Sequence, residues 1–151
     1  MLIRKTASLT VLLLAAALAA GCQGPCPHRQ CCPARDGVFV HISHGAESSH
    51  AVLMALKMAN LMSADRDVLV YFDVTGVNVV LKDAPDLVSP TFESSGAQLT
   101  ALLDKGVPLY VCPSCLTAAG KRPEDLRPGV KIAEKDAFFG FTKGRILTLD
   151  Y

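Results

Sequence analysis

Two cysteines three residues apart, in the segment Val111-Cys112-Pro113-Ser114-Cys115, have the types and spacing best suited to chemistry. A thiolate is a nucleophile, and two thiols at this spacing can close a redox disulfide or chelate a soft metal. Pro113 suits the first position of a helix, which would place Cys115 in the first helical turn. Free backbone N–H groups and the positive helix end lower a thiol pKa there. An inert disulfide between the two cysteines is the alternative.

Histidines form the second candidate group. His44 follows the first expected strand, whose end should lie close to the strand end that carries Cys112, so we predict that His44 stabilises a thiolate there. The alternative is a solvated loop residue. His41, three residues earlier, is expected to be a hydrogen-bonded, partly buried side chain, and His50 a surface residue.

A third group of possible ligands precedes the folded region. It consists of Cys26, His28, Cys31 and Cys32. Soft thiolates with an imidazole can hold Cu(I) or Zn²⁺, although the spacing matches no common structural zinc pattern. The alternative is a tether whose thiols form disulfides. Methionines at positions 54, 58 and 62 share one helix face, and we expect them to be core filler rather than copper ligands.

The first 21 residues have the features of an export signal. Arg4 and Lys5 precede ten consecutive apolar residues, which is the length of a signal-peptide core and too short to span a bilayer. The run ends in Leu18-Ala19-Ala20-Gly21-Cys22, which resembles the cleavage motif of bacterial lipoproteins. That resemblance implies cleavage before Cys22 and acylation of its sulfur. An ordinary secretory signal and a retained membrane anchor are the alternatives.

Residues 22–36, rich in Cys and Pro, would then tether a folded domain, residues 37–151, to a bilayer. Gln23 follows the candidate lipidated cysteine in place of the Asp that retains enteric-type lipoproteins in the inner membrane. We therefore expect a lipid-anchored protein of the cell envelope, on the outer membrane and facing the periplasm if the cell has two membranes. Disulfides can persist in that compartment.

The composition excludes several classes of protein. The chain has 151 residues and a net charge of +1, which does not suit a nucleic-acid binder. Half of the residues are hydrophobic, which excludes a disordered chain. No phosphate-binding glycine loop, nucleophile elbow or zinc-protease motif is present in the sequence.

The elements that must position the thiols alternate along the sequence. Alternating strands and helices predict an α/β domain, a three-layer sandwich around a mainly parallel sheet of about five strands. We expect strands at 37–43, 67–73, 107–111, 129–133 and 145–150. We expect helices at 48–63, 97–105 and 135–141, and residues 77–81 fit either a strand or a helix.

Two stretches carry a resemblance to a known family. DGVFVHISHGAESSHAVLMALKMANLMSADRDVLVYFD and the stretch from GVPLYVCPSC to the terminal ILTLDY resemble the DsrE/DsrF-like family, including YchN-like proteins. The resemblance covers residues 36–151. It implies a YchN-like fold, trimers or hexamers, and a cysteine that carries sulfur as a persulfide, at the position of Cys112. Members are usually cytosolic, whereas the signal sequence here predicts export.

The interpretation that joins these observations is a membrane-anchored carrier of sulfur or thiols rather than a conventional enzyme. Cys112 would hold a persulfide or mixed disulfide, Cys115 would resolve it, and His44 would polarise the site. No cofactor is required in this interpretation, and the partners are the bilayer, a sulfur-donor or thiol protein, and further copies of the chain. The alternatives are a copper- or zinc-binding lipoprotein and an oligomeric scaffold with structural thiols.

Overall fold

The computed structural model describes residues 34–151, which form one compact unit. The predictions for the signal peptide, for Cys22 and for the Cys26, His28, Cys31 and Cys32 group fall outside these residues. Among the helices of residues 34–151, none has the length and apolar character needed to cross a membrane.

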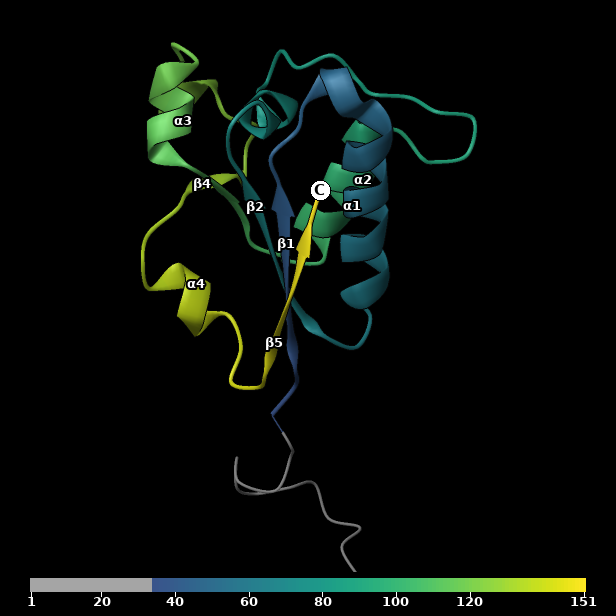
Figure 1. Ribbon diagram of the computed structural model, residues 1–151, viewed down its shortest axis with the longest axis vertical. Coiled ribbons are helices and arrows are strands. Elements are labelled where there is room, and N and C mark those ends of the chain that lie inside the picture. The colour runs from purple at the N-terminus through teal and green to yellow at the C-terminus, as the bar shows by residue number, and fades with distance from the viewer. Residues whose placement is uncertain (1–33) are drawn as a thin grey trace, which may run out of the picture. The chain divides into compact units, whose positions relative to one another are not determined.

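Five parallel strands form a single sheet in the order β4-β3-β2-β1-β5, which confirms the predicted α/β class. The strands are β1 (Gly37–Ile42), β2 (Asp67–Phe72), β3 (Leu109–Val111), β4 (Lys131–Ile132) and β5 (Ile146–Asp150). Since all strands run the same way, their carboxyl ends meet at one edge of the sheet (Figure 1). The order reverses between β1 and β5, so this edge has a topological switch point there.

Helices lie on both sides of the sheet (Figure 1). The longer pair, α1 (Ser49–Met62) and α2 (Ser95–Asp104), lies on one side, and the short α3 (Pro113–Ala118) and α4 (Ala137–Gly140) lie on the other. Three short 3-10 helices complete the domain, η1 (Ala46–Ser48), η2 (Gly76–Val80) and η3 (Pro123–Asp125). The ambiguous segment at 77–81 is therefore mostly helical.

The hydrophobic core lies between the sheet and the longer helices. Val38, Val40 and Ile42 alternate along β1 toward this side and are almost fully buried, as a covered strand requires. They meet α1 residues that are fully buried, namely Val52, Leu53, Ala55, Leu56 and Ala59. The methionines at 54, 58 and 62 differ from expectation in part, because all three are only half-buried and, of the three, Met62 packs against the core.

Two element boundaries differ from the sequence prediction for clear reasons. The helix predicted from residue 97 begins at Ser95, because the Ser94 hydroxyl accepts a hydrogen bond from the Ala97 N–H and caps the helix. The Asp86 carboxylate also accepts the N–H of Gly96, at 2.7 Å. β4 retains only two residues of the predicted five, since it pairs with the three-residue β3 alone.

Candidate functional site

The two thiols lie at the carboxyl edge of the sheet, where β3 passes into α3. Cys112 directly follows β3, and its backbone N–H donates to the Phe72 carbonyl at the end of β2. Pro113 begins α3, as predicted, and Cys112 is the residue before the helix. Both thiols are free and half-buried. Neighbouring ends of two parallel strands therefore fix the reactive segment in the place where open α/β sheets bind ligands.

The environment of Cys112 favours its thiolate. Burial opposes the charged form and would raise the pKa, but hydrogen bonds from the Tyr71 hydroxyl and from the Cys115 and Ser114 backbone N–H groups outweigh it. The net result is a Cys112 pKa below the ordinary value. For Tyr71, burial and its hydrogen bond to Cys112 raise the pKa strongly, so the phenol keeps its proton and remains a donor.

The environment of Cys115 favours its protonated form. The Val74 backbone N–H donates to the Cys115 sulfur and lowers the pKa, but burial, the hydrogen bond with Cys112 and the charges of Cys112 and Asp73 outweigh that bond. The pKa of Cys115 is therefore raised. Val74 has φ of +42°, a rare value for a β-branched residue, and this backbone conformation orients its N–H. The two thiols thus differ, because the pKa of Cys112 is lowered and that of Cys115 is raised, which favours Cys112 as the first of the two to ionise.

His41, on β1, forms a charged cluster with the carboxylates of Asp73 and Asp150. Its Nδ1 donates to Asp150 Oδ1 at 2.7 Å. Its Nε2 lies 2.9 Å from Asp73 Oδ1, an ion-pair distance, although neither atom has a well-aligned hydrogen bond within residues 34–151. Burial lowers the His41 pKa, but the two carboxylates outweigh burial and raise it, which favours the imidazolium. The ring also stacks on Tyr71, with centroids 5.7 Å apart.

The three histidines of residues 34–151 occupy different environments. His44 is exposed in the loop after β1, and the hydrogen bond of its ring in the described part of the chain is with the Ser43 hydroxyl, at 3.3 Å. His50 is exposed on α1 and packs edge-to-face with Phe92. The structure therefore brings His41, rather than His44, to the tyrosine that contacts Cys112. A polarising role for His44 remains a prediction.

Sequence reasoning missed Tyr71, Asp73 and Asp150. A signal for two of them was present, because Tyr71 and Asp73 alternate on the second expected strand. The parallel register places His41 beside Tyr71 and beside Asp150. Strand order decides such pairing, and one sequence does not reveal it. Within residues 34–151, no group of three or more His, Cys, Asp and Glu side chains is arranged to hold a metal ion.

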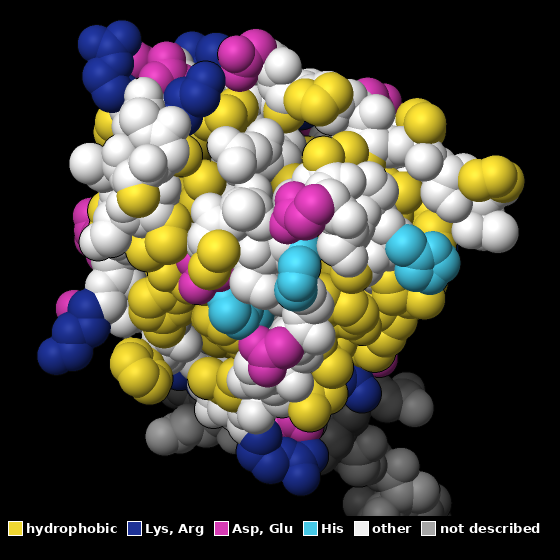
Figure 2. Space-filling model, turned by 45° about the horizontal axis from the view of Figure 1, so that its top comes forward, with side chains coloured by type: hydrophobic (Ala, Val, Ile, Leu, Met, Phe, Trp, Pro, Cys, Tyr) yellow, Lys and Arg dark blue, Asp and Glu magenta, His cyan; other side chains and the backbone are white. Residues whose placement is uncertain are grey.

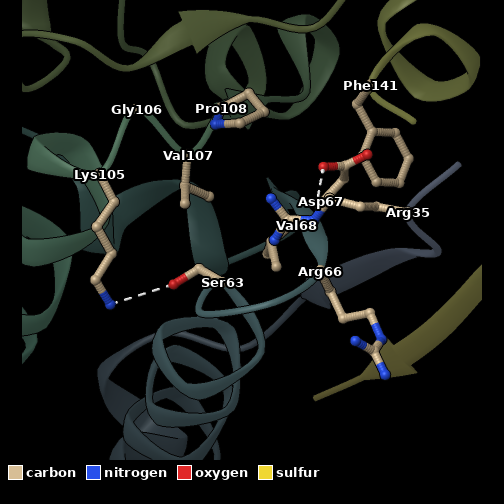
Figure 3. A pocket seen from close by; sticks show the side chains of 10 residues that line it. All are labelled: Arg35, Ser63, Arg66, Asp67, Val68, Lys105, Gly106, Val107, Pro108 and Phe141. Atoms are coloured by element: carbon tan, nitrogen blue, oxygen red, sulfur yellow. Dashed lines mark hydrogen bonds and ion pairs between the residues drawn. The ribbon is translucent and has the colours of Figure 1, made fainter. Parts of the chain in front are cut away.

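A cavity of about 290 Å³ lined by basic residues lies at the amino edge of the sheet (Figure 3). Its cations have partners: Arg35 forms an ion pair with Asp67 at 3.8 Å, and Lys105 donates to Ser63 Oγ at 3.2 Å. Arg66 pairs with Asp65 on the surface. This cavity is at the opposite end of the strands from the thiols, and its two arginines are paired with aspartates.

Comparisons with known proteins agree on the family and the fold of this chain. The model of the DsrE/DsrF-like family matches residues 36–144. Two solved structures are similar in fold. The ychN protein from E. coli has a TM-score of 0.60 at 18% identity, over 76% of this chain and 99% of that chain. MTH1491 from Methanobacterium thermoautotrophicum, titled a protein of unknown function, has a TM-score of 0.53 at 21% identity, over the same shares. No curated protein matches the sequence. The family model spans most of the chain and the fold agrees with it, so this protein belongs to the DsrE/DsrF-like family.

Proposed function

We propose that the protein carries sulfur on Cys112, as a persulfide, with Cys115 as the resolving thiol. Membership of the DsrE/DsrF-like family suggests a sulfur-relay role. The observation that carries the proposal is the placement of two free, half-buried thiols at the carboxyl edge of the sheet, where β3 passes into α3. Their environments lower the pKa of Cys112 and raise that of Cys115. A carrier needs one thiolate that attacks first and a second thiol that waits.

The chemistry has two balanced steps. In the first, the Cys112 thiolate attacks the outer sulfur of a donor persulfide, R–S–SH. The donor S–S bond breaks, RS⁻ leaves with the bonding electrons, and Cys112 becomes Cys112–S–SH. In the second step, Cys115 loses its proton to water and attacks the Cys112 sulfur, which forms a Cys112–Cys115 disulfide and expels HS⁻. A dithiol reductant then restores both thiols by disulfide exchange.

Tyr71 assists the first step in this proposal. Its hydroxyl donates to the Cys112 sulfur, and its raised pKa keeps it protonated. While the persulfide on Cys112 is in its protonated form, Cys112–S–SH, the thiolate charge that raises the Cys115 pKa is absent. Cys115 therefore becomes easier to ionise at the stage when its attack is required.

Mass spectrometry after alkylation tests the proposal. The full chain is incubated with an organic persulfide, and sulfane sulfur is located on tryptic peptides. We expect wild type to release HS⁻ and accumulate disulfide, Cys115→Ser to accumulate the persulfide on Cys112, and Cys112→Ser to lose sulfur uptake at least tenfold. Ser114→Ala, which changes an exposed side chain between the two cysteines, is the matched control. Unchanged uptake by the Cys112→Ser, Cys115→Ser double variant would contradict the proposal.

We further propose that Cys22 is acylated, as the resemblance of residues 18–22 to a lipoprotein cleavage motif implies, and that the chain assembles into homo-oligomers, as the family resemblance implies. Membrane fractionation of wild type against Cys22→Ser, together with the mass of the solubilised particle, tests both points.

A further inference from the structure

A cavity of about 480 Å³ lies on the face of the sheet that carries Phe39 and His41 of β1. Its floor is aromatic. Phe138 of α4 packs edge-to-face on Phe39 of β1 and Tyr71 of β2, with ring centroids 5.7 and 5.0 Å apart. Phe139, 73% exposed, and Ile146 line its rim. A volume of this order accepts a small organic molecule.

One end of the cavity is polar and offers almost only hydrogen-bond acceptors. His41 and Asp73 line this end, together with Thr148 of β5. His41 Nδ1 donates to Asp150, and His41 Nε2 is buried 2.9 Å from Asp73 Oδ1 without a well-aligned hydrogen bond in the described part of the chain. Neither N–H of His41 is therefore open to a ligand, whereas the Asp73 carboxylate, which lines the cavity, retains lone pairs that can accept. A ligand group that binds at this end must therefore donate hydrogen bonds.

The charge of this end also selects the ligand. Two carboxylates flank one imidazolium, so the cluster is net negative when His41 is protonated. Figure 2 shows histidine and acidic side chains in the middle of the carboxyl edge, while lysine and arginine side chains lie toward its periphery. Aromatic faces attract cations as well. A protonated amine satisfies all three conditions, because it is cationic, it donates, and it can lie over a ring.

The position of the cavity in the fold agrees with ligand binding. Besides α4, its lining comes from β1, β5 and β2 with the residue after it, and the strand order reverses between β1 and β5. Open α/β sheets bind their ligands beside such a switch point.

We propose that this cavity binds a small amphipathic amine. The ammonium group would contact Asp73, and an apolar or aromatic body would lie on Phe39, Tyr71 and Phe138. The site goes beyond the proposed sulfur chemistry and does not depend on it, since neither cysteine lines the cavity. Occupancy would nevertheless cover Tyr71, the donor to Cys112, so a bound amine is expected to slow alkylation of Cys112.

Titration of the isotope-labelled full chain with 2-phenylethylammonium, followed by NMR at pH 7, tests the proposal. We expect shift changes at Phe39, His41, Tyr71 and Thr148, and binding at least tenfold tighter than that of 3-phenylpropionate, which has a similar body and the opposite charge. Cys112→Ser should bind the amine as wild type does, which separates this test from that of the sulfur carrier.

Two variants remove the charge preference in different ways. Asp73→Asn should weaken amine binding at least tenfold, and Thr148→Lys, on the exposed edge strand, should do the same if Asp73→Asn fails to fold. Asp83→Asn, an exposed carboxylate paired with Lys121 at 3.9 Å, is the matched control and should bind as wild type. Equal or tighter binding of the carboxylate probe, shifts confined to other surfaces, or full affinity in Thr148→Lys would each overturn the proposal.

Discussion

The two faces of the sheet are built for different purposes. On the face toward α1 and α2, β1 presents Val38, Val40 and Ile42, all at most 3% exposed. On the other face the same strand presents Phe39 and His41, both half-buried under the short α4. Alternation along one strand thus separates stability from chemistry. The covered face holds the fold, and the open face holds the histidine cluster and the aromatic cavity beside the thiols.

The largest expected difference between the faces is in stability. Leu56→Ala, at a fully buried position of α1, should reduce the free energy of unfolding by about 3 kcal/mol, because it removes buried methyl groups and leaves a cavity. Phe39→Ala on the open face should cost about 1.5 kcal/mol, since the ring is only half-buried. Urea unfolding of both variants measures the contrast. Equal losses would show that the open face contributes as much to the core as the covered one.

A smaller effect should appear in thiol reactivity. Tyr71→Phe removes the hydroxyl that donates to Cys112, so the Cys112 pKa should rise by about one unit, as loss of a charge-assisted hydrogen bond predicts. Alkylation of Cys112 at pH 7, followed by mass spectrometry of its peptide, should slow about tenfold. Tyr110→Phe changes the neighbouring tyrosine in register with Tyr71 and is the control. A rate unchanged by Tyr71→Phe would remove the tyrosine from the site.

The smallest effect is a pH dependence of stability that originates on the open face. The pKa of His41 is raised in the folded state, so the folded state holds its proton more tightly. The resulting stabilisation is complete below the unfolded pKa, near 6.5, and is lost as pH rises through the raised folded pKa. It should amount to less than about 1 kcal/mol, because the pair is partly exposed to solvent. His41→Gln should lack this part of the pH profile in urea unfolding, and an identical profile would contradict the assignment.

Much of the covered face could be predicted from the sequence. Apolar residues at helical spacing along α1 and nearly continuous apolar runs in β1 and β2 specify burial through local periodicity. The parallel α/β class follows from the alternation of such segments. The position of Cys112 and Pro113 at the start of α3 is equally local, and the structure agrees with it.

The open face could be predicted far less well. The His41 cluster joins residues 109 positions apart, and it exists because β5 inserts beside β1. Strand order is a property of the whole chain, and no local pattern encodes it. The positive φ of Val74 could not be predicted for a related reason. Valine disfavours this conformation, so only the surrounding structure can impose it.

Val74 links the turn after β2 to α3, the helix that contains Cys115. A left-handed valine relaxes toward ordinary φ values whenever its surroundings loosen. The relaxation would turn its N–H away from Cys115, whose pKa that amide lowers. We therefore expect release of this amide to accompany opening of α3, and amide hydrogen exchange at Val74 would measure how often the thiol site opens.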